Sequence, residues 1–321
     1  MFDLVAMGEI LIDFTPRGMS EQGNPMFEQN PGGGPANLAC AAAKHGSKVS
    51  FITKAGKDYF GRFLKKVIEE NGVDASNFIL SEENKTTLAF VHLDATGDRS
   101  FSFYRKNGAD TMIKKEEVNL DLLKNTRYFF LSSVLMAEGT SRATSFYMME
   151  QAKSLGVPII FDPNLRFNLW EKEEELKECV QKSFRYADIV KVSEEELFYF
   201  TEHKTVKEAA AELAKEYEIA VLMVTLGGEG CYLLYQDEGT MIKGYKVDKV
   251  VDTTAAGDSF TGGFVSRLTS YEKPYYELNQ QELIDAISYG NGVGALTVTK
   301  KGAISALPTK EEVEKFRKGL D

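Results

Sequence analysis

The order of apolar segments along the chain constrains its fold more than any other feature of the sequence. Short apolar stretches with the character of strands alternate with longer helical stretches, which is typical of a parallel sheet covered by helices. Near the N-terminus, for example, a strand predicted over residues 47–54 precedes a helix predicted over residues 57–71. Gly72 then stands where a left-handed helix stop is expected. We therefore expect an α/β protein with a doubly wound, mostly parallel sheet flanked by helices.

The other predicted elements continue this alternation toward the C-terminal half. Strands are predicted over residues 4–14, 128–133, 157–162, 188–192 and 219–226, and helices over residues 35–45, 141–155 and 206–217. The sequence contains no internal repeat and no low-complexity linker, which favours one main domain.

Two segments break the alternation and predict a small β appendage. Residues 15–30 are polar and lack helical periodicity, and residues 86–104 alternate like a hairpin with a turn at 94–98. A hairpin inserted at this point is a natural lid over the carboxyl ends of the strands. Its exposed edge also predicts a homodimer through the lid. The predicted division is a lid of residues 15–30 and 86–110 and a main domain of residues 1–14, 31–85 and 111–321.

Charge and composition narrow the range of partners. The 321 residues include 48 Asp and Glu against 38 Lys and Arg, giving a formal net charge of −10. This balance repels phosphate backbones and anionic lipids, so we expect neither a nucleic-acid nor a membrane partner. No apolar run approaches the roughly 18 residues that a membrane-spanning helix needs, and acidic residues stand where a signal peptide carries basic ones. We expect a cytoplasmic protein.

Cysteine and histidine are too sparse to indicate a metal centre. The three cysteines and three histidines occur singly, without the spacing of a disulfide framework or of a zinc site. The chemistry of this chain is therefore expected to rest on carboxylates, Arg, Lys, Asn and glycine-rich backbone.

The most informative stretch runs from Val251 to Phe260 and continues into an apolar helical run. The small residues Ala255, Ala256 and Gly257 let the backbone approach a ligand, and the helix beginning there aims free N–H groups at it. This pattern predicts an anion hole. Asp258, in the first helical turn, is placed to take a proton from a hydroxyl that attacks a phosphoryl group held by those amides. The alternative is that Asp258 only caps the helix.

Two further glycine-rich turns support a ligand site at the strand ends. Residues 31–37 place Gly33 and Gly34 before a helix that carries Asn37, an amide able to donate and accept hydrogen bonds. Residues 225–230 form another such turn after an apolar strand. Asp13, at the end of the first predicted strand, can accept hydrogen bonds from neighbouring sugar hydroxyls. Each turn alone could be a simple tight turn, but three in one α/β domain favour a ligand site.

The two common nucleotide-binding fingerprints are missing from the sequence. It contains no GxxxxGK[ST] motif, and residues 290–294 do not form GxGxxG after a strand. A P-loop NTPase and a Rossmann dehydrogenase are therefore disfavoured.

The glycine-rich turn with Asn37 and the stretch from Asp252 to Asp258 resemble the two signatures of the ribokinase-like (PfkB) carbohydrate kinases. Within that family the chain is most similar to bacterial and plant fructokinases. The segments that carry this similarity are residues 8–14, 103–105, 162–166 and 191–196. The resemblance implies a ribokinase-like fold with a small β lid, and ATP-dependent phosphorylation of a sugar hydroxyl, converting D-fructose to D-fructose 6-phosphate.

The resemblance also implies roles for individual residues. Asp258 would be the general base beside an anion hole of Ala255, Ala256 and Gly257. The sugar would be held by Asp13, Gly33, Gly34, Asn37, Tyr104, Arg105 and Arg166, and the nucleotide by Asn164, Thr225, Gly227, Gly230 and Asn291. Glu196 would organise Mg²⁺ through water, and Asp252 and Thr254 match positions that often ligate a monovalent cation such as K⁺.

One departure from the fructokinase pattern, one departure from the wider family pattern and two alternative functions accompany this interpretation. Fructokinases usually carry glycine at the position of Ala255, where alanine would be strained if the backbone needed a positive φ. Ser193 replaces the asparagine that is usual in the wider family. Tyr104, Arg105 and Arg166 could equally bind a carboxylate, which would suit 2-keto-3-deoxygluconate or another small acceptor of the same family. A sugar or nucleotide sensor on a kinase scaffold is the non-enzymatic alternative.

Overall fold

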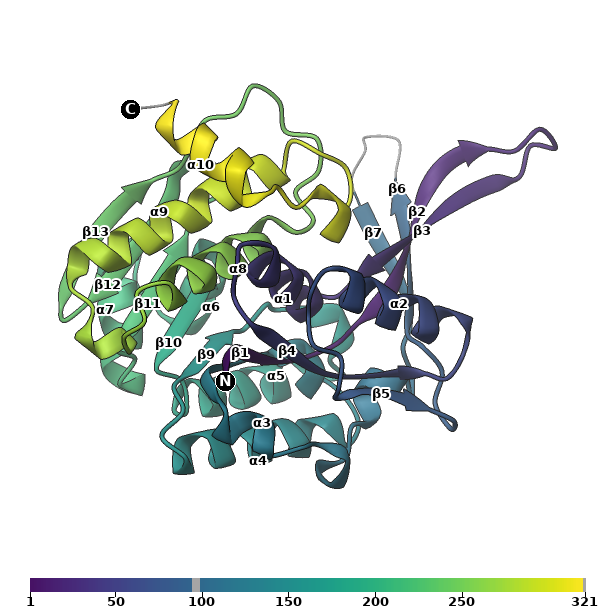
Figure 1. The fold of residues 1–321 in the computed structure, drawn as a ribbon, viewed down its shortest axis with the longest axis horizontal. Helices are drawn as coiled ribbons and strands as arrows, with labels where there is room; N and C mark the ends of the chain where they lie inside the picture. The colour runs from purple at the N-terminus through teal and green to yellow at the C-terminus, as the bar shows by residue number, and fades with distance from the viewer. Residues whose placement is uncertain (94–98, 320–321) are drawn as a thin grey trace.

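A nine-stranded sheet forms the centre of the protein, in the order β13-β12-β11-β10-β9-β8-β1-β4-β5 (Figure 1). The computed structural model describes residues 1–93 and 99–319. Seven strands run parallel: β1 (Phe2–Met7), β4 (Val49–Gly56), β5 (Phe78–Ser81), β8 (Thr126–Ser132), β9 (Ile159–Asp162), β10 (Ile189–Ser193) and β11 (Val221–Thr225). The antiparallel strands β12 (Gly230–Tyr235) and β13 (Glu238–Lys243) extend one edge. The mostly parallel α/β sheet is confirmed, although the sequence did not predict the β12–β13 hairpin.

Helices cover both faces of this sheet (Figure 1). One face carries α1 (Gly34–Lys44), α2 (Tyr59–Glu70), α8 (Ala256–Thr269) and α9 (Gln280–Thr297), and the other carries α3 (Asp121–Lys124), α4 (Ser141–Ser154), α5 (Glu173–Phe184), α6 (Glu194–Phe200) and α7 (Val206–Tyr217). The strands alternate between the two cores: in β1, Leu4 and Ala6 pack toward α1 and α8, whereas Val5 and Met7 pack toward the other layer. The C-terminal helix α10 (Lys310–Lys318) lies on α9.

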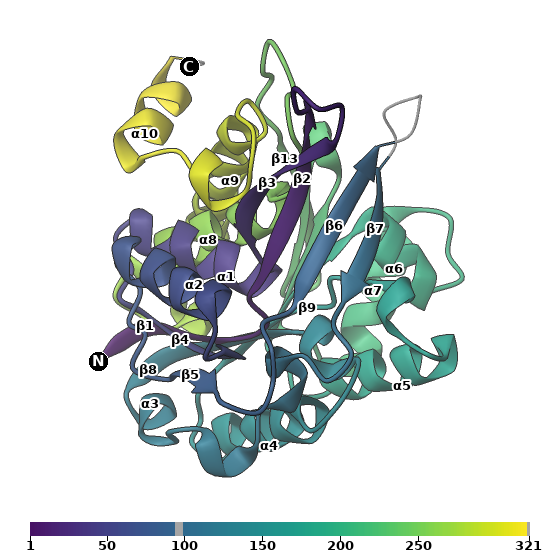
Figure 2. The same cartoon turned by 90° about the vertical axis from the view of Figure 1, so that its right-hand side faces the viewer.

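A separate four-stranded sheet stands beside the large one, in the order β3-β2-β6-β7 (Figure 2). Its strands are β2 (Leu11–Met19), β3 (Pro25–Gly32), β6 (Leu88–Leu93) and β7 (Arg99–Tyr104). Phe14 and Phe90 stack on it with ring centroids 4.9 Å apart. The predicted turn at 94–98 lies outside the described residues.

The strand predicted over residues 4–14 is wrong as a single element. β1 ends at Met7 in the large sheet, and β2 begins at Leu11 in the small one. Gly8 lies at the break, where a Cβ atom would come within 2.1 Å of the Pro35 side chain. The first turn of α1 therefore packs directly on the chain as it leaves the large sheet, and the mostly apolar pattern of residues 4–14 conceals this change of sheet.

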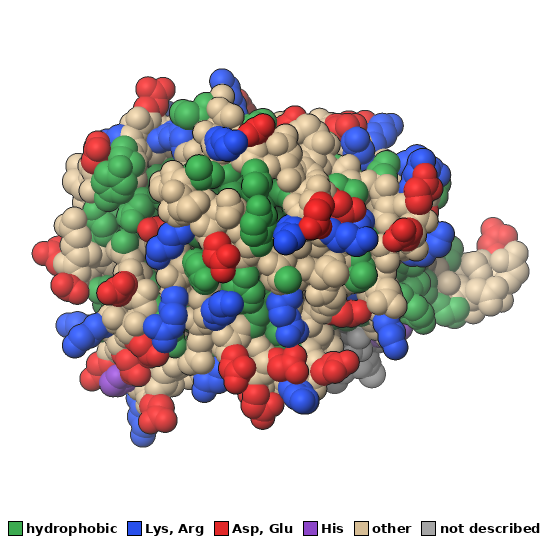
Figure 3. All heavy atoms as spheres, turned by 90° about the horizontal axis from the view of Figure 1, so that it is seen from below, with side chains coloured by type: hydrophobic (Ala, Val, Ile, Leu, Met, Phe, Trp, Pro, Cys, Tyr) green, Lys and Arg blue, Asp and Glu red, His purple; other side chains and the backbone are tan. Residues whose placement is uncertain are grey.

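Helix ends agree with the glycine signals. Gly46, Gly72 and Gly156 follow α1, α2 and α4 with φ of 107°, 77° and 68°, in the left-handed region that glycine favours. Within the described residues, none of the helices combines the length and apolarity needed to cross a membrane. On the face seen from below, positive and negative side chains are interspersed (Figure 3).

Candidate active site

The carboxyl ends of the parallel strands gather most of the predicted site residues at one edge of the large sheet. The chain passes from β1 outward to β4 and β5, then returns to β8 on the other side of β1. This reversal is the kind of switch point where open α/β sheets hold ligands. Asn164 and Arg166 follow β9, and Thr225 ends β11.

Asp258 lies in the first turn of α8 and is held by two amides from distant parts of the chain. Asn37, in α1, donates through Nδ2 to Asp258 Oδ2 over 3.0 Å. Asn164 donates through Nδ2 to Oδ1 over 3.3 Å. These contacts fix the orientation of the carboxylate. Ala255, the residue before α8, has φ of −112°, so alanine is unstrained there.

A cavity of about 160 Å³ opens beside Asp258. Its walls include residues predicted for sugar binding and catalysis: Asp13, Gly33, Gly34, Asn37, Arg105, Arg166 and Asp258. Asn164, predicted for the nucleotide, also lines this cavity and not the second one described below. Its size and its carboxylate, amide and guanidinium lining suit a polyhydroxylated molecule. Asp13 is half-buried in the wall, and burial raises the pKa of its carboxyl to about 6, although Arg166 lowers it in part.

A second cavity, of about 310 Å³, lies on the other side of the α8 N-terminus. It contains the predicted nucleotide residues Thr225, Gly227, Gly230 and Asn291, together with Ala256 and Gly257. Tyr245, Val250 and Phe260 add apolar surface suited to a flat base. The start of α8 therefore contributes to both cavities, with Asp258 facing one and Ala256 and Gly257 facing the other.

The turn before α1 needs glycine at one position. Gly33 has φ of 111°, and a Cβ atom there would lie 2.5 Å from the backbone oxygen of Glu9. We expect Gly33→Ala to lower the free energy of unfolding by about 3 kcal/mol, because left-handed strain and a backbone clash combine. Thermal or urea unfolding checks this. Gly228→Ala is the control, since a Cβ at Gly228 meets no atom within 4 Å. Equal loss in both variants would contradict the prediction.

Two residues at the end of β7 that were predicted to bind the sugar, Tyr104 and Arg105, are placed differently from the other predicted sugar residues. The Tyr104 side chain is 69% exposed, packs its ring on Phe90 and is absent from the lining of the cavity. Arg105 does line the cavity, but it is 4% exposed and its guanidinium is paired with Asp110 at 2.7 Å and with the Val134 carbonyl at 3.0 Å. Arg105 therefore joins the base of the small sheet to the main body.

Glu196 has both carboxylate oxygens occupied by backbone amides. Oε1 accepts from Leu165 N over 2.7 Å, and Oε2 accepts from Ser193 N over 2.8 Å. Ser193 Oγ in turn accepts from Glu196 N, so the serine completes a capping box at the start of α6. No group of three or more His, Cys, Asp or Glu suited to a metal ion occurs within the described residues.

Lys191 was not among the predicted site residues, although it lies near the anion hole. Its ammonium is 3.1 Å from Asp162, and a Cβ added at Gly257 would lie 3.2 Å from Nζ. Burial works against its charge, but Asp162 and then Glu196 raise the pKa of Lys191 above its ordinary value. The sequence signal that could have identified Lys191 is its position within the apolar strand β10. A buried charge needs a partner, so a lysine in such a strand indicates a nearby acidic group.

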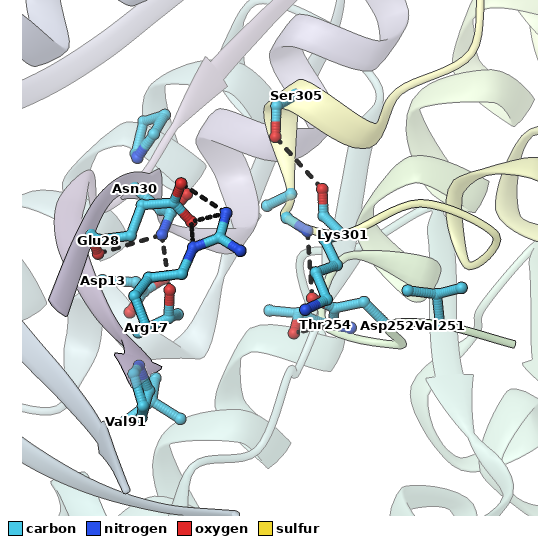
Figure 4. A pocket seen from close by; sticks show the side chains of 15 residues that line it. Asp13, Arg17, Glu28, Asn30, Val91, Val251, Asp252, Thr254, Lys301 and Ser305 are labelled. Carbon is cyan, nitrogen blue, oxygen red and sulfur yellow. Dashed lines mark hydrogen bonds and ion pairs between the residues drawn. The ribbon is translucent and has the colours of Figure 1, made fainter. Parts of the chain in front are cut away.

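Asp252 and Thr254 lie where two loops meet at a third cavity, of about 230 Å³ (Figure 4). Asp252 Oδ1 accepts from Thr254 N and Oγ1 over 3.0 and 2.5 Å, and Oδ2 accepts from Gly302 N over 3.1 Å. Figure 4 shows Arg17 and Glu28 of the small sheet across this cavity from Lys301. Asp13 and Thr254 line both this cavity and the one beside Asp258.

Comparison with known proteins identifies the family to which this fold belongs. The profile described as "pfkB family carbohydrate kinase" matches residues 1–310, and the chain belongs to this family.

Several relatives of this chain are named fructokinases. The chain is 40% identical over 315 residues to fructokinase-1 of Oryza sativa subsp. japonica, with 98% of this chain and 97% of the relative covered. The crystal structure of a Xylella fastidiosa fructokinase with bound ATP superposes with a TM-score of 0.91 at 30% identity, covering 100% of this chain and 99% of the other. A Vibrio cholerae O395 fructokinase in a form binding fructose, ADP and a calcium ion has a TM-score of 0.88 at 33% identity, covering 98% and 99%. These likenesses confirm the predicted fold and family.

Proposed function

We propose that the protein is a fructokinase, which transfers the terminal phosphoryl group of ATP to D-fructose and yields ADP and D-fructose 6-phosphate. The observation that carries the proposal is the position of the α8 N-terminus between two cavities. One cavity has the size of a sugar and contains Asp258, and the other has apolar walls suited to a nucleotide base. The names of the relatives, and the fructose and ADP in the Vibrio cholerae structure, support the choice of substrates.

The proposed reaction uses positioning and charge stabilisation. Asp258 accepts the proton of the sugar hydroxyl, the hydroxyl oxygen forms a bond to the terminal phosphorus, and the bond from that phosphorus to the ADP oxygen breaks. Backbone amides of residues 255–258 stabilise the charge on the transferring group. Lys191 lies beneath Gly257, with its ammonium paired with Asp162.

Asp13, Gly33, Gly34, Asn37 and Arg166 are proposed to hold the sugar, and Asn164, Thr225, Gly227, Gly230 and Asn291 to hold the nucleotide. The arrangement of arginines favours fructose over a keto acid. A carboxylate clamp would need Arg105, whose guanidinium already pairs with Asp110. Arg166 remains, and it faces the Asp13 carboxyl, which would repel a second carboxylate.

Metal ions are proposed to assist phosphoryl transfer without being bound directly by a cluster of protein side chains. Magnesium bound with ATP neutralises phosphate charge. Because both oxygens of Glu196 accept backbone hydrogen bonds, this carboxylate fits an ion better through water than directly. The Asp252 carboxylate and the Thr254 hydroxyl are oxygen donors of the kind that K⁺ prefers.

We propose that residues 15–30 and 86–110 act as a lid on a kinase domain of residues 1–14, 31–85 and 111–321, and that two lids meet in a homodimer. Met19 and Tyr104 expose 60% and 69% of their surface on the small sheet, which supports an apolar contact there. A cytoplasmic location suits the use of ATP. Sedimentation as a monomer at micromolar concentration would contradict the dimer.

The acceptor is tested by measuring ADP release with Mg-ATP and fructose, ribose, 2-keto-3-deoxygluconate, adenosine or glucose. We expect the highest kcat/KM with fructose. A higher kcat/KM with the keto acid would retain the kinase assignment and overturn the choice of sugar.

Protonation of the Asp13 carboxyl is expected to weaken sugar binding at acid pH. With its pKa raised to about 6, this group is ionised above that pH and loses its capacity to accept two hydroxyl hydrogen bonds below it. We expect the Kd for fructose to rise about tenfold per pH unit below pH 6. Calorimetric titration without ATP measures this and avoids protonation of the nucleotide. A flat profile from pH 7 to pH 4.5 would contradict the prediction.

A further inference from the structure

Asn164 adopts an uncommon backbone conformation beside the proposed base. It lies in the loop after β9, and its φ of 45° is in the left-handed region. Asparagine tolerates this region better than most residues, but the conformation is costly and persists where surrounding contacts hold it. The side chain of this residue donates through Nδ2 to Asp258 Oδ1 over 3.3 Å. The strained residue is therefore the one that contacts the carboxylate proposed to remove the sugar proton.

The amide of Asn164 is confined where it meets Asp258. A Cβ atom at Gly34, in the first turn of α1, would lie 2.7 Å from Asn164 Nδ2 and 3.1 Å from Asp258 Oδ1. All three residues line the sugar cavity. Because α1 closes one side of this contact, a rotation of the Asn164 backbone cannot be absorbed there without moving Nδ2 relative to the carboxylate.

Asp162, the last residue of β9, holds the backbone of Asn164. Its Oδ1 accepts from Asn164 N over 3.0 Å, two residues further on, as in the Asx turns that asparagine and aspartate form with their own backbone. Its Oδ2 lies 3.1 Å from the Lys191 ammonium on the neighbouring strand β10. Asp162 is 1% exposed, and each of its two oxygens has one of these partners. Lys191 therefore orients the carboxylate that orients the backbone of Asn164.

The next backbone N–H along the loop is held in the same manner. Leu165 N donates to Glu196 Oε1 over 2.7 Å, and Glu196 is also buried. Two successive N–H groups of the loop are therefore bound by two buried carboxylates, one from β9 and one from α6. Buried carboxylates are costly unless they are paired or hydrogen-bonded, so their concentration at one short loop indicates that the position of the loop matters.

We propose that Asp162 is a positioning residue for phosphoryl transfer, which acts through Asn164 on Asp258. This inference rests on the proposed function, since it assumes that Asp258 is the base. Asp162 lines neither the sugar cavity nor the nucleotide cavity. By accepting from Asn164 N it stabilises the left-handed turn, and the turn keeps Asn164 Nδ2 on the Asp258 carboxylate. Loss of this acceptor lets the turn relax and leaves the base less well aligned with the sugar hydroxyl.

The test compares two double variants that both replace the buried ion pair by neutral side chains. The first combines Asp162→Asn with Lys191→Met, and its amide oxygen can still accept from Asn164 N. The second combines Asp162→Leu with Lys191→Met, and its side chain has a similar shape but no acceptor. Replacing both charges together avoids leaving one of them buried and unpaired. We expect kcat of the leucine variant to be about tenfold below that of the asparagine variant, with KM for fructose and for ATP differing by less than about threefold.

Repeating the comparison with Asn164→Gly decides whether Asp162 acts through Asn164. Glycine adopts a φ of 45° freely and keeps the backbone N–H, but it has no amide for Asp258. In this background the asparagine and leucine variants should therefore differ in kcat by less than about twofold. A tenfold difference that persists with Asn164→Gly, or equal kcat of the two double variants with Asn164 intact, would overturn the proposal. If the leucine variant does not fold, Asp162→Ala with Lys191→Met supplies the same comparison.

The proposed function can fail separately from this inference. If the wild type prefers another hydroxylated acceptor to fructose, fructokinase activity is contradicted, and kcat of the variants is then measured with that acceptor. Wild-type turnover of Asp258→Asn would contradict the base on which the inference rests. Equal kcat of the two double variants, in an enzyme that Asp258→Asn inactivates, would overturn the role of Asp162 alone.

Discussion

Replacing Asp258 with asparagine is expected to lower kcat for sugar phosphorylation by about 10³-fold, within the range that general base catalysis contributes. The asparagine keeps the shape of the side chain but cannot accept the hydroxyl proton. Asn37 and Asn164 both donate to the carboxylate, so one of these amides must turn to present its oxygen to the new NH2 group, after which the variant should still fold and bind fructose. ADP release measures kcat, and calorimetry measures the Kd for fructose.

Asp248→Asn is a matched control, because Asp248 is exposed in the loop that leads to α8 and lines neither cavity. It should retain wild-type kcat. If Asp258→Asn kept wild-type turnover, Asp258 would not be the base, and the capping role would be sufficient to explain it.

Asp13→Ala is expected to lower kcat/KM for fructose by about 10³-fold through loss of sugar binding. A carboxylate that accepts two hydroxyl hydrogen bonds contributes more than a neutral acceptor, and its removal leaves the sugar hydroxyls unpaired. Arg166 would also lose the carboxyl that faces it. KM for ATP should stay within a few-fold, since Asp13 lies outside the nucleotide cavity.

Asp13→Asn separates charge from shape. It keeps one acceptor and should be intermediate, while Asp248→Ala should behave as wild type. A proportional rise of both KM values in Asp13→Ala would instead indicate a general disturbance of the α1 and β2 region.

The sequence predicted the layered α/β architecture because each strand and helix carries its own periodicity. The change of sheet between β1 and β2 could not be predicted in this way, since residues 4–14 are apolar apart from Gly8, Glu9 and Asp13. Gly8 was the single local signal, and its meaning depends on Pro35, which packs against it from a later turn. The β12–β13 hairpin was missed because its two-residue turn is Gln236-Asp237, with φ of 51° and 63°, instead of the Asn-Gly or Asp-Gly pair that usually marks such a turn.

The gathering of glycine turns and Asp258 at one sheet edge was predictable, because parallel strands bring their carboxyl ends together. The directions of individual side chains were not. Arg105 pairs with Asp110, five residues further on, and this local pairing competes with a reach toward the sugar. Lys191 was missed although it is a charged residue within the apolar strand β10, a pattern that often marks a paired charge.

The measurement that tests the central claim most directly is identification of the product formed from ATP and D-fructose, by ³¹P and ¹³C NMR. The account predicts ADP and one phosphate monoester in which phosphorus couples to C6 of fructose. A product phosphorylated at another carbon, or release of inorganic phosphate without any sugar phosphate, would contradict it.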